Sequence, residues 1–316
     1  MAAEQQTTSD TSDQTSSPQS IPQIWRRLGL WPLRVAWLGC AIGVGRPAIH
    51  AAGQFDGSGP LIVETWLWGA WFIGVVAILV PAPASLTAIR LLSSGSISVA
   101  VLGLVLTNNS RSDLWLALAV AIGVTALSFQ PVVGDLMVNG SAYGSERRMP
   151  LRPPGFALVG PVQVAWLLVM LGALSGPILM ASGWLIAGIG ASLVGLGAIW
   201  AGVRVLHQLA RRWVVFVPAG FVIHDPVVLI ESILLGRTKI VALGPASIPL
   251  DDQATDLGRG ARGLALAVRP KAPVEFAIRK PGVVESTTSS VLVFNPSLPG
   301  AVLKEARARA IPIGEA

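Results

Sequence analysis

A basic segment near the middle of the chain has the residue types that bind anionic groups. Residues 143–155 read YGSERRMPLRPPG, contain the only tyrosine of the 316-residue chain, and lie between long apolar stretches. Arg147, Arg148 and Arg152 carry planar guanidinium groups, which pair with phosphate or carboxylate through two parallel hydrogen bonds. We expect these arginines and Tyr143 to contact anionic lipids or a protein partner. The segment would lie against lipid headgroups or against a cytosolic domain formed by the C-terminal part of the chain, with Tyr143 as its packed or interfacial residue and Glu146 as a partner for an arginine. The alternative is that the arginines only orient the neighbouring apolar stretches in a membrane.

Two charged residues, Arg46 and Glu64, lie inside apolar stretches joined by the short connection 53–60. A charge within a membrane costs a few kcal/mol or more, so it usually has a partner and often a task. Because both residues can reach a similar depth, we predict an intramembrane ion pair between Arg46 and Glu64. Gating or binding at an outward-facing cavity, and extension of each side chain to the nearby surface, are the alternatives.

Two further patterns share features with catalytic motifs. The run GRGARG at 258–263 has the glycine spacing of a dinucleotide site but leads into a strand-like run, which predicts a hairpin loop. The pair His224-Asp225 occurs in metal-dependent phosphohydrolases, but His50 and His207 lie in or beside apolar stretches and cannot join it. Since no nucleophile–base pair, phosphate loop or carboxylate pair is evident either, we predict no enzyme, no metal site and no cofactor.

The composition indicates an integral membrane protein. Hydrophobic residues make up 52% of the chain and charged residues 13%, and the mean hydropathy is +0.64. Soluble domains usually carry about a quarter charged residues. Eleven tryptophans, many near the ends of apolar runs, suit the headgroup layer of a bilayer. The net charge of +6 does not indicate nucleic acid, because the arginines lie between the apolar runs instead of forming one stripe.

The first 24 residues differ from the rest of the chain. They are polar, and the first basic residue is Arg26. A secretory signal has a basic start followed at once by an apolar run. We therefore expect residues 1–24 to be a retained, disordered cytoplasmic tail. The single Cys40 cannot form an internal disulfide and is expected to be a small buried hydrophobe.

Six apolar stretches predict a transmembrane domain over residues 25–206. Each stretch is close to the roughly 20 residues that a helix needs to cross the hydrocarbon core. Arg46-Pro47 interrupts the first stretch, and the polar run SSGSIS lies in the third. The six predicted spans are 33–52, 61–82, 85–106, 113–131, 157–180 and 183–206.

The charges between the predicted spans indicate their orientation. With a cytoplasmic N-terminus, ten arginines lie on the inner side and only Arg46 and Arg111 on the outer side. Positive charge favours the cytoplasmic side, so we predict a multi-pass protein of the plasma membrane with both termini and the 132–156 loop inside. The ten inner arginines are Arg26, Arg27, Arg34, Arg90, Arg147, Arg148, Arg152, Arg204, Arg211 and Arg212.

Small residues in the last predicted span recur at four-residue spacing. One row contains Ala187, Ala191 and Gly195, and a second contains Gly188 and Ser192. Such rows let two helices approach closely within a membrane. They predict either packing inside a single bundle or a dimer interface.

The chain beyond Arg212 changes character. Short runs rich in β-branched residues alternate with Gly and Pro, which predicts a β-rich cytosolic domain over residues 207–316. We expect one helix over 298–309 to close this domain, with Val302 and Ala306 facing the strands.

This order of elements resembles bacterial pleckstrin-homology-like domains. The resemblance covers residues 213–310, where about seven short predicted strands precede a helix, and it implies a compact β fold with a C-terminal helix. In lipid-binding members, basic residues often line the first strand-to-strand loop, whereas this turn reads PAG and carries no charge. The whole layout also resembles actinobacterial polytopic membrane proteins of this size.

These features lead to one expected function and one alternative. We expect a non-enzymatic plasma-membrane protein that presents a cytosolic β domain to a partner protein or to lipid headgroups. A small transporter or channel-like protein is the alternative, and it would use Arg46, Glu64 and the polar third span.

Overall fold

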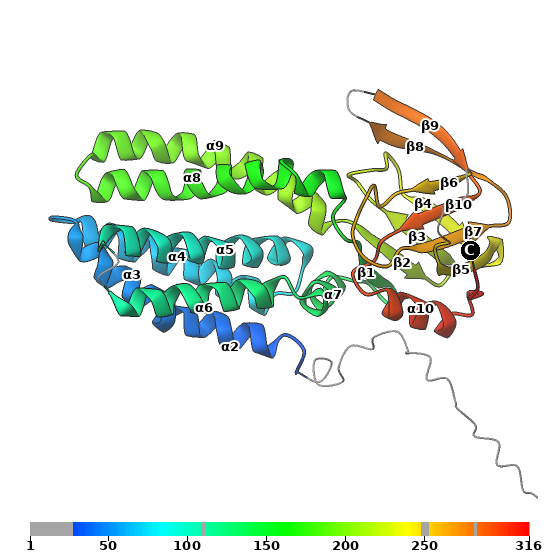
Figure 1. Cartoon of the computed structure of the whole chain (residues 1–316), viewed down its shortest axis with the longest axis horizontal. Coiled ribbons are helices and arrows are strands. Elements are labelled where there is room, and N and C mark those ends of the chain that lie inside the picture. The colour runs from blue at the N-terminus through cyan, green and yellow to red at the C-terminus, as the bar shows by residue number, and fades with distance from the viewer. Residues whose placement is uncertain (1–27, 109–110, 248–252, 281–282, 316) are drawn as a thin grey trace, which may run out of the picture.

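The chain forms a helical bundle at one end and a β domain at the other (Figure 1). The computed structural model describes residues 28–108, 111–247, 253–280 and 283–315. The predicted tail 1–24 lies outside the described residues, as do Arg26 and Arg27. The predicted order, apolar helices first and a β-rich region afterwards, is confirmed.

The first predicted span is a helix in three parts. It consists of α2 (Trp31–Cys40), a π-helical turn (Ala41–Gly45) and α3 (Arg46–Ala51), with right-handed helical dihedrals at both joints. Proline has no amide hydrogen to donate, and a π turn can absorb such a break. The Arg46-Pro47 pair therefore interrupts the regular α-helix without ending the helical path.

Within the residues that the structure describes, four helical segments are long and apolar enough to cross a membrane: α4, α5, α8 with the 3-10 turn before it, and α9. A fifth is added if α6 and α7 form one span, with a bend of 57° between them. Pro131 opens α7 after an extended Gln130, which explains the bend. The bounds are α4 (Gly59–Leu79), α5 (Pro83–Leu106), α6 (Ser112–Ser128), α7 (Pro131–Asn139), the 3-10 turn (Gly155–Leu158), α8 (Pro161–Ala181) and α9 (Leu185–Ala210).

Helices α8 and α9 touch through small residues. A Cβ atom added to Gly195 would lie 2.3 Å from the carbonyl oxygen of Gly172, and one added to Gly176 would lie 2.0 Å from Oγ of Ser192. Gly188 is also buried against α8, with Met180 as its neighbour. The row that contains Gly188 and Ser192 therefore packs inside the bundle.

We predict that Gly195→Val destabilises the bundle by about 1–3 kcal/mol, because the new side chain meets the α8 backbone. Gly197→Val is the matched control, since a Cβ atom at Gly197 meets nothing within 4 Å. Thermal unfolding of the purified protein in detergent measures both variants. Equal melting temperatures for the two variants would show that α8 and α9 are not in contact at Gly195.

The β domain contains two four-stranded sheets and a two-stranded ribbon. The first sheet is antiparallel throughout, in the order β1-β2-β3-β4, with β1 (Arg147–Pro150), β2 (Trp213–Val217), β3 (Gly220–His224) and β4 (Ile233–Gly236). The second has the order β5-β7-β10-β6, with β5 (Ile240–Pro245), β7 (Leu266–Pro270), β10 (Val291–Phe294) and β6 (Ala254–Asp256). The ribbon pairs β8 (Val274–Lys280) with β9 (Val283–Ser289) and extends away from the sheets (Figure 1).

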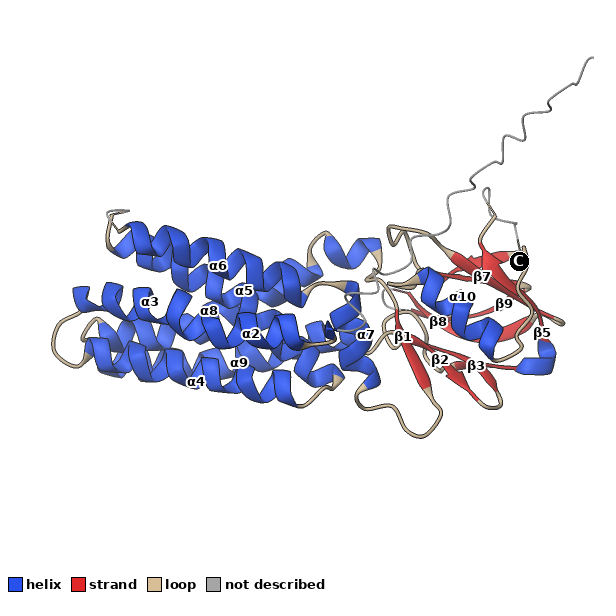
Figure 2. Cartoon of the chain, turned by 90° about the horizontal axis from the view of Figure 1, so that it is seen from below, coloured by secondary structure: helices blue, strands red, loops and turns tan. Residues whose placement is uncertain are grey.

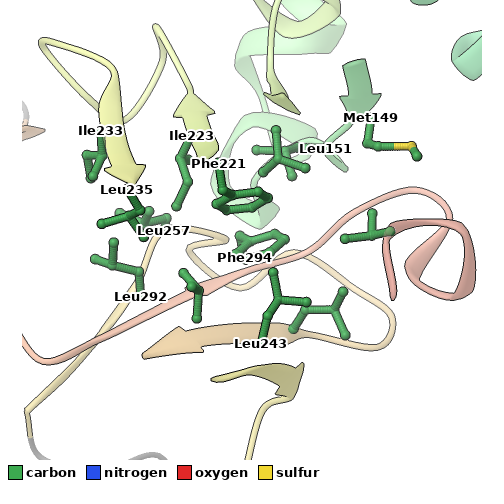
Figure 3. Packing of buried hydrophobic residues seen from close by; sticks show 14 of the residues in the cluster. Met149, Leu151, Phe221, Ile223, Ile233, Leu235, Leu243, Leu257, Leu292 and Phe294 are labelled. Atoms are coloured by element: carbon green, nitrogen blue, oxygen red, sulfur yellow. The ribbon is translucent and has the colours of Figure 1, made fainter. Parts of the chain in front are cut away.

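The two sheets share one apolar core. Phe221 of β3 lies opposite Phe294 of β10, with ring centroids 5.6 Å apart (Figure 3). Helix α10 (Pro299–Ala308) closes the core through Val302 and Ala306, which are fully buried. The predicted closing helix and its buried face are confirmed.

Strand β1 comes from the 132–156 loop and not from residues 207–316. Arg148 pairs in register with Val215 of β2, and Met149 is buried in the core of the β domain. Both Figure 1 and Figure 2 show β1 beside β2 at the end of the helical bundle. The β domain therefore includes a strand that lies between two membrane-type helices in the sequence.

Candidate functional site

A buried ion pair fastens the β domain to the end of α9. The side chains of Arg212 and Asp225 are 1% and 0% exposed, and two hydrogen bonds of 2.8 and 2.6 Å join them. Arg212 Nη1 also donates to the carbonyl oxygen of Arg152 at 2.5 Å, and this bond holds the basic segment 143–155 beside the ion pair. Asp225 Oδ1 accepts from the amides of Val227 and Val228 as well. Asp225 therefore has a structural role at this junction.

His224 lies beside this ion pair in a different environment. Its ring stacks on Trp213, with centroids 5.2 Å apart, and its Nδ1 is 2.8 Å from Oγ of Ser232. Partial burial lowers the pKa of His224, and the nearby positive charge of Arg211 lowers it further. In the part of the chain that the structure describes, no group of three His, Cys, Asp or Glu residues could hold a metal ion.

Two arginines of the basic segment are engaged within the protein. Arg147 pairs with Asp135 of α7 at 2.6 Å, and Arg148 pairs with Glu146 at 2.9 Å. The hydrogen bond from Arg148 lowers the pKa of the Glu146 carboxyl group. Tyr143 is 89% exposed and available for contact.

Helix α10 also holds the basic segment. Arg309, which follows α10, donates from Nη2 to the carbonyl oxygen of Ser145 at 2.6 Å. Its guanidinium carbon lies 5.9 Å from the ring centroid of Phe216 in β2. Backbone pairing and side-chain contacts together therefore dock the segment on the β domain.

Arg46 and Glu64 lie at the other end of the bundle. Arg46 is exposed, and Glu64 accepts a hydrogen bond of 3.4 Å from Nε1 of Trp68. Among the residues that the structure describes, no ion pair joins Arg46 to Glu64. The structure thus does not bring the predicted pair together.

The polar residues of the predicted third span, now α5, are engaged between helices. Ser93 Oγ lies 2.9 Å from Ser128 Oγ, and Thr125 of α6 donates to the Ser93 carbonyl oxygen at 2.8 Å. Trp166 of α8 donates from Nε1 to Ser94 Oγ at 2.8 Å. These hydrogen bonds join α5 to its neighbours, so the polar run contributes to helix packing.

A cavity of about 760 Å³ lies where the helices meet the β domain. Its wall is mostly apolar, and it includes side chains of α5, α8 and α9 as well as the segment 150–153. Three arginines also line it: Arg90 of α5, Arg152 of the basic segment, and Arg262 of the loop before β7. Binding sites for small molecules typically have this size and this mixture of apolar walls with a few polar groups.

The predicted hairpin loop 258–263 forms part of this junction. It connects β6 to β7, so it is a loop between strands and does not open a helix. It is not the predicted hairpin, because β6 and β7 lie on either side of β10 and do not pair with each other. The side-chain amide of Asn295 donates to the carbonyl oxygens of Ala261 and Gly263. A Cβ atom on Gly263 would lie 2.8 Å from Cζ of Arg152, so the glycine leaves room for that guanidinium group.

Arg90 and Arg262 were not among the site residues predicted from the sequence. Arg90 is the only charged residue between Glu64 and Arg111, and a lone charge within an apolar helix is a recognisable indication of a task. Arg262 lies in a polar loop, and its type and neighbours do not distinguish it from other exposed arginines.

Comparison with known proteins adds no further identification. No family model, no curated protein and no solved structure matches the chain.

We predict that Asp225→Asn destabilises the β domain by about 3–5 kcal/mol, because it leaves the buried Arg212 charge without its partner. The double variant Arg212→Met/Asp225→Leu removes both charges and should recover much of that loss. Pulse proteolysis of the membrane-embedded protein in increasing urea measures both variants. If Asp225→Asn unfolds at the wild-type urea concentration, the ion pair does not hold the junction.

Proposed function

We propose that this chain is a non-enzymatic, multi-pass plasma-membrane protein that presents its β domain at the cytoplasmic surface to a partner protein or to lipid headgroups. The observation that carries the proposal is the origin of β1. This strand belongs to a connection between two apolar helices, yet it completes the first sheet of the β domain. A domain built in this way keeps a set orientation toward the membrane, which suits a binding surface.

The proposed topology has six spans with both termini inside. It counts α2 with α3 as the first span and α6 with α7 as the fourth. The distribution of arginines supports it, because Arg147, Arg148 and Arg152 lie beside the β domain. Arg111, at the opposite end, lies 3.3 Å from Nδ1 of His50 in α3. A cytoplasmic β domain would thus agree with the preference for positive charge on the inner side.

The proposed β fold is pleckstrin-homology-like. Two sheets around one core, closed by the C-terminal helix α10, support this reading of the element order. The first sheet of the β domain additionally contains β1, which precedes α8 and α9 in the sequence.

Site-specific photo-crosslinking in native membranes tests the proposed function. A photoreactive residue in place of the exposed Tyr143 should capture a cytosolic protein or inner-leaflet lipids. The same residue in place of Ser58, which is exposed at the opposite end of the bundle, is the matched control and should capture neither.

A flux assay with the protein in liposomes tests the transporter alternative. Saturable solute transport that disappears in Glu64→Gln would establish the transporter alternative, and the proposed binding role would then be wrong.

A further inference from the structure

We propose that the junction cavity binds one anionic phospholipid of the inner leaflet. Its phosphate would lie among the guanidinium groups of Arg90, Arg152 and Arg262, and an acyl chain would lie along α5 and α8. The inference rests on the proposed function in one respect, which is that the β domain lies at the cytoplasmic surface. To the proposed function it adds the class of ligand and the cavity in which that ligand binds.

The cavity has an excess of positive charge in its lining. Arg90, Arg152 and Arg262 come from three separate parts of the chain and line the same cavity. In the described ranges, none of the three forms an ion pair, whereas Arg147, Arg148 and Arg212 each have an acidic partner. Like charges beside an apolar wall repel one another more strongly than in water. A phosphate group would neutralise them and accept paired hydrogen bonds.

Arg90 shows that hydrogen-bond donors remain available. Its Nε donates to the carbonyl oxygen of Ser128 at 3.3 Å, and its guanidinium group lies 5.0 Å from the ring centroid of Phe129. Its two Nη atoms donate to no protein group among the described residues. Since no fully buried side-chain nitrogen or oxygen there lacks a partner, these Nη atoms are not fully buried. Arg90 lines the cavity, so we expect its free donors to serve a ligand there.

The apolar wall argues for a lipid over a soluble phosphate. Besides the arginines, the cavity is lined by Leu91 of α5, Val162 and Leu167 of α8, and Leu206 of α9. A ligand that contacts both the arginines and these apolar side chains would be charged at one end and apolar at the other. Arg152 and Arg262 lie in loops beyond the helix ends, and Arg90 is the eighth residue of α5, so the charged groups lie near the expected depth of lipid headgroups.

The cavity also has a route from the bilayer. Leu158 of the 3-10 turn and Leu167 of α8 line it, and these side chains are 41% and 49% exposed. We propose that a phospholipid enters sideways past these two side chains.

Native mass spectrometry of the full-length protein tests the proposal. The protein is released from vesicles that contain equal amounts of phosphatidylglycerol and phosphatidylcholine. We expect one retained phosphatidylglycerol in preference to phosphatidylcholine. Arg90→Gln and Arg262→Gln should each reduce this preference about fivefold, which corresponds to about 1 kcal/mol. Arg237→Gln and Arg307→Gln are matched controls, because these exposed arginines of the β domain do not line the cavity.

A second variant separates a lipid from a free phosphate. Val162→Trp keeps the three arginines and fills the apolar part, so it should abolish lipid retention while leaving the melting temperature near that of the wild type. If Arg90→Gln does not fold, Arg262→Gln in the exposed loop still decides the charge argument.

Three results would overturn the proposal: equal retention of both lipids by the wild type, unchanged preference in Val162→Trp, or displacement of the lipid by inorganic phosphate. If crosslinking from position 143 still captures a cytosolic protein, the proposed function survives that failure. Capture of nothing, together with selective lipid retention, would instead contradict the partner-binding role and support the cavity site.

Discussion

The buried pair of Arg212 and Asp225 is the constraint on which the arrangement of the molecule depends. Arg212 lies two residues after the end of α9, and Asp225 directly follows β3 of the first sheet. A charge with so little exposure is tolerable only with a close partner, so the two residues define where the helix may meet the sheet. The carbonyl oxygen of Arg152 accepts a further hydrogen bond from Arg212, which holds the basic segment at the same point.

The rest of the junction follows from that attachment. With the segment held beside Arg212, its residues Arg147–Pro150 can pair with β2, and Met149 can enter the β core. The connection between α7 and α8 thus contributes strand β1 to the β domain, and the buried ion pair fixes that domain to the end of α9. The cavity exists because the helix ends, the basic segment and the 258–263 loop surround it from different sides. Its three arginines line one cavity only in this assembled state.

Much of the fold could be predicted because its patterns are local. Apolar length indicated the helices, and helical periodicity placed Val302 and Ala306 against the strands. Strand β1 could not be predicted, because RRMP is short, charged and without alternation, and its pairing partner lies more than sixty residues later. Similar depth in the membrane did not bring Arg46 to Glu64, since depth does not determine the direction in which a side chain leaves its helix.

Candidate site residues were harder to predict for the same reason. Arg212 reads as one more orienting charge in the sequence, yet its side chain is 1% exposed in the structure. The basic segment was recognisable by composition, and the partner of Arg148, Glu146, lies within it. The partner of Arg147 in α7 and the cavity beside Arg152 depend on segments brought together by folding. A contact between distant segments leaves no local pattern to read.

Hydrogen–deuterium exchange on the unmodified full-length protein tests most directly whether the connection between α7 and α8 contributes strand β1 to the sheet of the β domain. A strand hydrogen-bonded within a sheet exchanges its amides slowly, whereas an exposed loop exchanges them rapidly. The account predicts that the amides of Arg147, Arg148 and Met149 exchange as slowly as those of β2, while the amide of the exposed Gly144 exchanges rapidly. Rapid exchange throughout 143–150, with β2 still protected, would contradict the shared strand and with it the attachment of the two parts.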